Sequence, residues 1–300
     1  MTTDDTMGTI LAIVNPKAGG GRAAERWRAM KPLVERHLSF TEEWTTAPGH
    51  ATEIARQAAE RGVDRVLAIG GDGTVHEVVN GLAGTHVALG LLPMGTGNDF
   101  ARSAGVSGQT EDIAARLAKG STRAVDLGFV NGRYYINVAG VGFDAQVARI
   151  VSEMPRKGQG TVPYLATAVR LAFHYENPAL TITLDGTEQA PQKRLLIAVG
   201  NGAAYGGGMK ICPGARIDDG LLNVLLVDAL HGFPLLGLLA MVFRGGHLRD
   251  RRVSMVQARE IHVDGPSSVP VHADGEVIGG LPATFSVKPG ALQLWTPGPS

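Results

Sequence analysis

The pattern in this 300-residue sequence that best fits chemistry on a phosphate is Gly70-Gly71-Asp72-Gly73-Thr74. It follows an apolar stretch typical of a strand, residues 65–69, and precedes a segment of helical composition. Glycines let main-chain N–H groups approach an anion, and a helix N-terminus adds the positive end of its dipole. Asp72 would repel a phosphate unless a cation lay between them, so a magnesium-dependent nucleotide site is predicted. The alternative is a tight turn in which Asp72 caps the helix.

Two further glycine-rich loops also follow apolar stretches. Residues 15–21 (NPKAGGG) follow the first stretch, and residues 95–99 (GTGND) follow the stretch at 87–92. Parallel strands end at one edge of their sheet, where ligands bind, so the three loops can converge on one ligand. Taken singly, each of them could instead be an ordinary connection between a strand and a helix. None of them matches the pattern G-x-x-x-x-G-K-[ST], and Lys17 is therefore not assigned the role of the lysine in that motif.

The order of elements predicts two domains. Strand-like and helical stretches alternate through the first third of the chain, which predicts a three-layer α/β domain with a parallel sheet and helices on both faces, residues 8–128. The remainder, residues 129–297, has mostly strand composition with turn dipeptides between strands, and is expected to be a mostly antiparallel β domain with helices near 162–175 and 233–243. The turn dipeptides are Asn131-Gly132, Asp185-Gly186, Asp219-Gly220 and Asp274-Gly275.

Composition excludes several classes of protein. Lys plus Arg and Asp plus Glu each number 28, so no basic field exists to attract nucleic acid. One cysteine, Cys212, allows no intrachain disulfide, and the polar first residues do not resemble a secretory signal. The most apolar segment, residues 232–243, is shorter than the roughly 20 residues of a membrane span. We expect a cytoplasmic protein, soluble or peripheral at the inner face of the membrane.

A basic run follows that apolar segment: Arg244, His247, Arg249, Arg251 and Arg252. It could bind an anionic membrane surface, or it could be a solvated helix end. A second pattern, Gly140-Val141-Gly142-Phe143-Asp144-Ala145, fits the dinucleotide fingerprint, but no helix with an acidic residue about twenty positions later completes it. We interpret it as a turn.

Several segments, taken in order, resemble the catalytic domain of the diacylglycerol kinase superfamily, and most closely its bacterial soluble lipid kinases, relatives of sphingosine kinase. The loop GGDGT alone is not specific, because NAD kinases and phosphofructokinases share it. The resemblance implies a first domain of the NAD kinase and phosphofructokinase kind. Its segments are Asn15 to Gly19, Gly70 to Thr74 with Glu77 and Asn80-Gly81, Met94 to Arg102, Gly140 to Ala145, Gly206 to Gly208, Asp218 to Leu221, and Asp274 to Glu276.

Carried over by position, the resemblance implies ATP and Mg²⁺ as cofactors, with Asp72 meeting the nucleotide through magnesium. It also implies a structural metal held by the Asp219 carboxylate and the main-chain carbonyls of Arg216 and Leu221. Without the resemblance, Asp218-Asp219-Gly220 would be interpreted as a turn before a strand. The implied nucleotide contacts are Asn15, Thr46, Gly71, Asp72, Gly73, Thr74, Val75, His76, Glu77 and Thr96.

The turn Asp274-Gly275-Glu276 is the candidate source of the catalytic base. A hydroxyl that attacks the γ-phosphate must lose its proton, and a carboxylate can accept it. Glu276 is preferred and Asp274 is the second candidate, since residues two apart in an extended segment point the same way. An exposed acidic hairpin turn is the alternative.

The sequence thus favours a lipid kinase whose acceptor, a lipid of the diacylglycerol kind, enters between the domains. An NAD kinase-like enzyme is the rival within the same fold. A non-catalytic nucleotide- or lipid-binding protein is the rival from another class. The oligomeric state is left open, a homodimer included.

Overall fold

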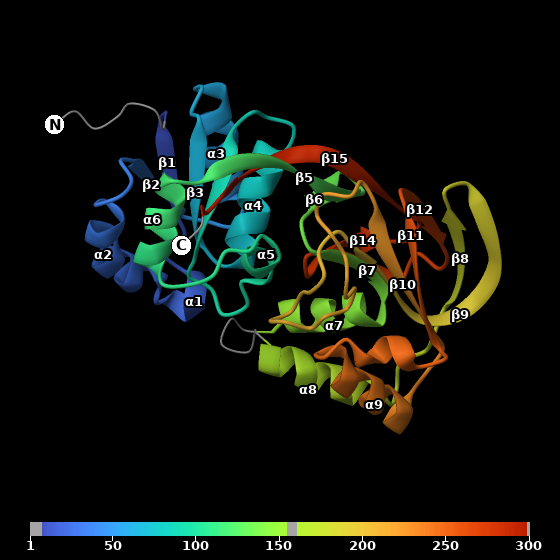
Figure 1. Ribbon diagram of the computed structural model, residues 1–300. Helices are drawn as coiled ribbons and strands as arrows, with labels where there is room; N and C mark the ends of the chain where they lie inside the picture. Colours follow the sequence, from blue (N-terminus) through green and yellow to red (C-terminus); the bar gives the residue numbers. More distant parts are fainter. Residues whose placement is uncertain (1–7, 155–160, 299–300) are drawn as a thin grey trace. The chain divides into compact units, whose positions relative to one another are not determined.

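The computed structural model describes residues 8–154 and 161–298. Its described residues divide into two compact units, residues 8–126 with 289–298, and those within 127–288 (Figure 1). The chain therefore passes from one unit to the other twice. The polar start of the chain, residues 1–7, on which the expectation about a secretory signal rests, lies outside the described residues.

The first unit contains the predicted parallel sheet. Its strands lie in the order β4-β3-β1-β2, and every neighbouring pair is parallel. The strand β2 was not expected, because its sequence TEEW has a single apolar residue and lies at the edge of the sheet. The bounds are β1 Ile10–Val14, β2 Thr41–Trp44, β3 Arg65–Gly70 and β4 Ala88–Pro93.

Helices cover both faces of this sheet. The chain moves along the sheet in one direction from β1 to β2 and in the other from β2 through β3 to β4, so right-handed crossovers put α2 on one face and α3 and α4 on the other. Figure 1 shows α2 and α6 on one side of the strands and α3 and α4 on the other, which confirms the three-layer prediction. The bounds are α1 Ala18–Gly21, α2 Ala23–Val34, α3 His50–Glu60, α4 Asp72–Leu82, α5 Asp99–Ser103 and α6 Thr110–Ala118.

The last residues of the chain complete the first unit. The end of β15 (Ala283–Thr296) pairs in parallel with β4, through Gln293 and Leu294. The Trp295 ring is fully buried and fills the space beside Gly90, where a Cβ would lie 2.7 Å from the ring. Residues 289–297, which the sequence placed with the second domain, therefore belong to the first unit. The sequence predicts a strand at 283–287. Its continuation to Thr296 was not predicted, because Pro289-Gly290 is typical of a turn.

The second unit is mostly antiparallel, as predicted. Its strands run in the order β14-β13-β7-β9-β8-β12-β15, and β10 pairs with both β9 and β11. Every pairing between these strands is antiparallel. The bounds are β5 Ser121–Val130, β6 Arg133–Tyr135, β7 Val138–Gly142, β8 Ala179–Leu184, β9 Thr187–Gly200, β10 Leu222–Asp228, β11 Val253–Ala258, β12 Glu260–Asp264, β13 Pro270–Ala273 and β14 Glu276–Gly280.

Three of the four predicted turn dipeptides connect hairpins. Asn131-Gly132, Asp185-Gly186 and Asp274-Gly275 all have positive φ at both residues, which is the type I′ geometry that matches the twist of the flanking strands. In Asp219-Gly220, only the glycine has positive φ, and this turn precedes β10 without forming a hairpin. The sequence chemistry of tight turns thus predicted the hairpins of this unit.

Side chains on both faces of the second unit's sheet are buried. Along β9, Ile197 and Val199 face an all-β core, whereas Leu196 and Ala198 face a second core shared with α7, α8 and α9. Helix α7 corrects the interpretation of residues 140–145 as a turn, because β7 ends at Gly142 and the helix starts at the next residue. The bounds are α7 Phe143–Ser152, α8 Thr161–Leu171, α9 Gly232–Val242 and a 3₁₀ turn, η3, Gly246–Arg249. Among the described residues, no helix has the length and apolar character to cross a membrane.

Replacing Trp295 with alanine should destabilise the first unit by about 3–5 kcal/mol, because a large buried side chain leaves a cavity. The indole also donates a hydrogen bond to the Leu117 carbonyl, at 3.0 Å. Thermal unfolding would show the loss. Trp44→Ala, at the partly buried edge strand, should cost much less, and equal losses would contradict the packing role of Trp295.

Candidate active site

The three glycine-rich loops of the first unit touch through their main chains. A Cβ on Gly95 would lie 2.6 Å from the Cα of Gly71, and a Cβ on Gly19 would lie 2.6 Å from the carbonyl oxygen of Met94. Real side chains do not fit at such distances, so the glycines are required by contact. The predicted convergence of the loops at the carboxyl edge of the parallel sheet is confirmed.

Polar side chains join the loops. The Asn15 amide donates to the Thr74 hydroxyl at 2.9 Å, and its carbonyl oxygen accepts the Lys17 N–H at 2.9 Å. Lys17 Nζ donates to the Thr46 carbonyl at 3.4 Å, and the Thr46 N–H donates to His50 Nδ1 at 3.1 Å. Asn15, Thr46 and Thr74 therefore lie at the same edge, each at or just beyond the end of a different strand.

Asp72 ties two of the loops together. Its Oδ1 accepts the N–H groups of Asp99, at 2.7 Å, and Phe100, at 3.3 Å. Burial raises the pKa of Asp72, the nearby Asp99 charge adds to this effect, and the main-chain donors oppose it. The Asp99 carboxylate forms an ion pair with Arg102. Burial therefore disfavours the negative charge of Asp72, and a cation bound beside this carboxylate would stabilise that charge.

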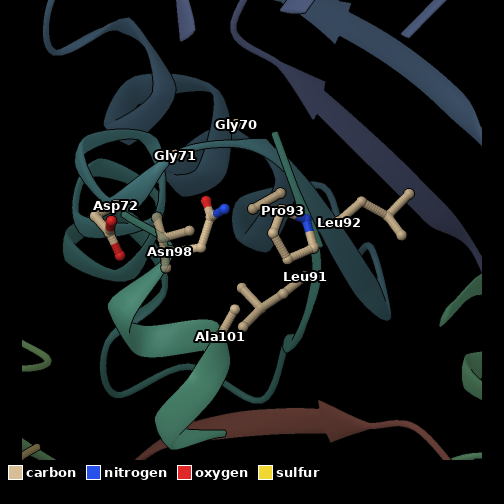
Figure 2. Close-up of a pocket in the computed structure, with 10 residues that line it drawn as sticks. Gly70, Gly71, Asp72, Leu91, Leu92, Pro93, Asn98 and Ala101 are labelled. Carbon is tan, nitrogen blue, oxygen red and sulfur yellow. The ribbon is translucent and has the colours of Figure 1, made fainter. Parts of the chain in front are cut away.

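Figure 2 shows the residues that line a small cavity in this region. Asp72 and Asn98 lie beside a cavity whose lining includes Gly70, Gly71 and Pro93. The cavity measures about 10 Å³, which is room for one water molecule and far too small for a nucleotide. A nucleotide on these loops would lie on their outer face, where Thr96 and Gly73 are exposed.

The remaining predicted contacts within 71–77 serve the packing of α4. The side chains of Val75 and His76 are buried. The Glu77 carboxylate accepts the Ala51 N–H at 3.0 Å, and the Glu77 carbonyl accepts the Thr52 hydroxyl at 2.8 Å. Glu77 therefore caps the start of α3, and only the main-chain groups at the beginning of α4 remain suited to a phosphate.

In the second unit, the structure separates the roles of the two candidate bases. The Asp274 carboxylate accepts three main-chain N–H groups, from Ile136 at 2.8 Å, Asn137 at 2.9 Å and Val138 at 3.1 Å. Its lone pairs are engaged in holding the connection between β6 and β7. Asp185, in the hairpin turn of the same type, likewise accepts two N–H groups, from Arg259 and Glu260, at 2.9 Å each. Asp274 is placed as an anchor of the fold.

Glu276 lies differently. Its side chain is 50% exposed, and its carboxylate is 3.8 Å from the guanidinium of Arg133. It lines a pocket of about 460 Å³, within the usual size of ligand sites. Most of the other lining side chains are aliphatic or aromatic; the lining comprises Ala148, Val151, Ser152, Tyr164, Tyr205, Gly206, Asp274, Gly275, Glu276 and Val277.

A buried network that the sequence did not reveal supports this turn. His272 Nδ1 accepts the Gly275 N–H at 3.2 Å, so the ring proton lies on Nε2, which donates to Asp144 Oδ2 at 2.9 Å. A Cβ on Gly140 would collide with both side chains, which explains the glycine at that position of β7. In the sequence, only Gly140 and Asp144 lie close enough together to suggest this network. Their partner, His272, is 128 residues away from Asp144.

Two tyrosines extend this network into the pocket. The Tyr205 hydroxyl donates to Asp144 Oδ2 at 3.4 Å and lies 3.3 Å from the Tyr164 hydroxyl. Burial raises the pKa of Tyr205 and of Tyr164, so both phenols stay protonated, and the Tyr164 hydroxyl also donates to the Asp144 carbonyl at 3.4 Å.

The predicted metal turn is closed by its own hydrogen bonds. Asp219 Oδ1 accepts the Leu221 N–H at 3.1 Å, and the guanidinium of Arg216 lies 3.2 Å from Asp218. In the described parts of the chain, no group of three or more His, Cys, Asp or Glu side chains could hold a metal. A cation here would depend on Asp219 and main-chain carbonyl oxygens, which suit Mg²⁺ by their hardness.

Comparison with known proteins matches both halves of the chain. Residues 9–130 fit the diacylglycerol kinase catalytic domain, and residues 137–296 fit the YegS C-terminal NAD kinase beta sandwich-like domain. The chain is 34% identical to a diacylglycerol kinase of Mycobacterium tuberculosis over 298 residues, 97% of this chain and 96% of that protein. The chain belongs to the diacylglycerol kinase family.

Other relatives agree with this membership. A protein of Pseudomonas aeruginosa named probable lipid kinase YegS-like is 32% identical, over 96% of this chain and 94% of its own length. The crystal structure of a diacylglycerol kinase from Bacillus anthracis matches with a TM-score of 0.76 and 25% identity, over 98% of each chain. An NAD kinase of Archaeoglobus fulgidus, solved with ATP, matches with a TM-score of 0.54 at 13% identity, over 96% of this chain and 94% of that one, which shows a shared fold.

Asp274→Asn should lower the stability of the second unit by about 1.5–3 kcal/mol, because it replaces charge-assisted hydrogen bonds to three N–H groups with a single amide oxygen. Thermal unfolding would measure this effect. Asp185→Asn is the matched control, since it perturbs a turn of the same type away from the pocket and should also lower the melting temperature. An unchanged melting temperature for Asp274→Asn would remove the anchor role.

Proposed function

We propose that this member of the family transfers the γ-phosphate of ATP to the hydroxyl of a lipid, with diacylglycerol as acceptor and phosphatidic acid as product. The observation that carries the proposal is the position of Glu276 on a pocket lined mainly by apolar and aromatic side chains. Such a pocket suits a hydroxyl attached to alkyl chains. A sugar or nucleotide acceptor would require more polar partners.

The glycine loops supply the nucleotide side of the reaction. The main-chain N–H groups at the start of α4 and the side chains of Asn15, Thr46 and Thr96 are suited to bind ATP phosphates and their neighbourhood. Asp72 and Asp99 carry neighbouring carboxylates, and burial disfavours the charge on Asp72. These oxygen donors fit Mg²⁺, which when bound would neutralise charge on the transferring phosphoryl group.

The chain's own residues then handle the proton. The acceptor oxygen forms a bond to the γ-phosphorus, and the bond to the bridging oxygen of ADP breaks. Glu276 takes the proton that the hydroxyl loses and releases it to solvent, to which its side chain is open. Asp274 and His272 hold the turn that carries Glu276, and the side chains of Tyr164 and Tyr205 form part of the pocket wall on which the acceptor would lie.

The two alternatives fit less well. An NAD kinase-like activity draws support from the shared fold alone, and the apolar pocket argues against a dinucleotide acceptor. A non-catalytic binding protein would have no need for Asp72 at the loops together with Glu276 at the pocket. We also propose the turn of Arg216, Asp219 and Leu221 as a structural Mg²⁺ site. Because its acceptor is a membrane lipid, we propose that the enzyme works at the inner membrane face.

The proposal is tested with labelled ATP and purified protein. The acceptors are diacylglycerol, monoacylglycerol, a sphingoid base and a ceramide in mixed micelles, with NAD as the competing acceptor. Preferred labelling of diacylglycerol is expected. Labelling of NAD alone, or of no acceptor, would refute the proposal.

Glu276→Gln should reduce turnover by roughly 10²–10⁴, the contribution typical of general acid–base catalysis, because it keeps the shape of the side chain and removes its basicity. ATP binding and the melting temperature should stay close to those of the wild type. Single-turnover kinetics would measure the loss. Glu188→Gln is the matched control, since Glu188 is exposed and lies two residues after Gly186 of a turn of the same type. Wild-type turnover in Glu276→Gln would place the base elsewhere.

Asp72→Asn should nearly abolish transfer and weaken magnesium-dependent ATP binding, because the amide removes the charge that a cation requires. The amide oxygen can still accept from the Asp99 and Phe100 N–H groups, so the fold should survive with a small loss. Calorimetric titration with ATP, with and without Mg²⁺, separates the two effects. Asp112→Asn, at an exposed position of α6, is the control. Activity of Asp72→Asn within a few-fold of the wild type would contradict the assignment.

A further inference from the structure

Helix α9 exposes apolar side chains that a helix of a soluble protein usually buries. Residues 232–242 include no charged or hydrogen-bonding side chain, yet only Leu235, Leu238 and Val242 are buried. The exposed face carries Phe233, Gly237, Ala240 and Met241, one above the other at helical spacing. Phe233 is 80% exposed. A helix that is apolar all round normally lies in a core or in lipid.

Helix α8 and the residues after it present a second stripe of the same kind. Val162, Ala166, Val169 and Phe173 are exposed at spacings of four, three and four, which places them on one face. The two stripes meet, because the rings of Phe173 and Phe233 are 5.6 Å apart, edge to face, and the Gly232 N–H donates to the Ala172 carbonyl at 2.8 Å. Figure 1 shows the two helices side by side. The two stripes form one surface, the α8–α9 face.

Charge around this face is mostly positive. Between Thr161 and Tyr175, and again between His231 and Arg249, the chain has no carboxylate, whereas Arg170, Arg244 and Arg249 are exposed. The carboxylates next to these segments are Glu176, which is exposed, and Asp250, which pairs with Arg252. Among the described residues, neither Arg170 nor Arg244 makes an ion pair. Two members of the basic run expected from the sequence are not available to an anionic partner. His247 is buried against the Ile211 carbonyl, and Arg252 pairs with Asp250.

We infer that the α8–α9 face docks on the surface of an anionic lipid bilayer. Exposed phenylalanines enter the boundary between headgroups and acyl chains, and arginines beside them bind the anionic headgroups. A second copy of this chain would bring the same cations together, which would cost electrostatic energy. The choice of lipid as partner rests on the proposed function, since the acceptor lies in a membrane.

Vesicle co-sedimentation without ATP tests the inference. The wild type should bind vesicles of phosphatidylcholine with phosphatidylglycerol more tightly than phosphatidylcholine alone. The double variant Phe173→Ser with Phe233→Ser should bind about tenfold more weakly. Arg170→Gln with Arg244→Gln should lose most of the preference for phosphatidylglycerol, about fivefold for each charge. Val256→Ser removes an exposed valine from β11, away from both helices, and should bind like the wild type.

A second measurement tests the inference even if the double phenylalanine variant fails to fold. Phe233→Trp should show a blue shift of its emission when vesicles are added. The inference would be overturned if that shift is absent, or if the double phenylalanine variant binds vesicles like the wild type. It would also be overturned if the wild type forms a dimer, the double variant is a monomer, and neither protein binds vesicles.

Turnover of a short-chain diacylglycerol in solution separates this inference from the proposed function. The double phenylalanine variant should turn over the soluble acceptor at the wild-type rate, because neither ring lines the Glu276 pocket. Vesicle binding by a protein that phosphorylates no lipid would support the α8–α9 face while the proposed function failed.

Discussion

The direct contact of main chain with main chain between the glycine loops is the constraint on which the first unit depends. Gly71 and Gly95 approach so closely that Gly95 cannot carry a side chain without a backbone shift, and Asp72 bridges the loops through two N–H groups at the start of α5. Such an approach requires β3 and β4 to be parallel neighbours that end level with each other. The sheet order, the glycines and the partly buried Asp72 carboxylate are therefore parts of one arrangement that brings the loops into contact.

In the second unit, two acidic residues of one hairpin turn differ in their surroundings. The Asp274 carboxylate accepts three main-chain N–H groups, and the Asp185 carboxylate accepts two. Glu276, in contrast, lines a pocket. The turn is also bonded through the Gly275 N–H to His272, whose ring is held in turn by Asp144. If Glu276 is the base, as proposed, it lies two residues from Asp274 in a tight turn, although its side chain is half exposed.

Local chemistry determined what the sequence could predict. Glycine loops after apolar strands, and Asx-Gly dipeptides with positive φ, carry their geometry in a few adjacent residues, and both were recognised. The edge strand β2 was not predicted because two of its four residues are glutamates, which are not typical of a strand. Helix α7 was not predicted because the glycine pattern before it was interpreted as a turn. The pairing of His272 with Asp144, and the return of Trp295 to the first unit, depend on residues far apart in the chain, for which a single sequence offers no local signal.

The return of β15 has a consequence for biosynthesis. The strand segment of the first unit that pairs with Ala88 and Leu89 follows the whole second unit in the sequence. A ribosome that has made residues 1–126 has produced a sheet whose β4 edge is still unpaired, beside a vacancy where the Trp295 ring belongs. The second unit is synthesised entirely before that gap is filled. The nascent first unit must therefore wait with an open apolar edge, the stage at which chaperones and aggregation compete for a growing chain.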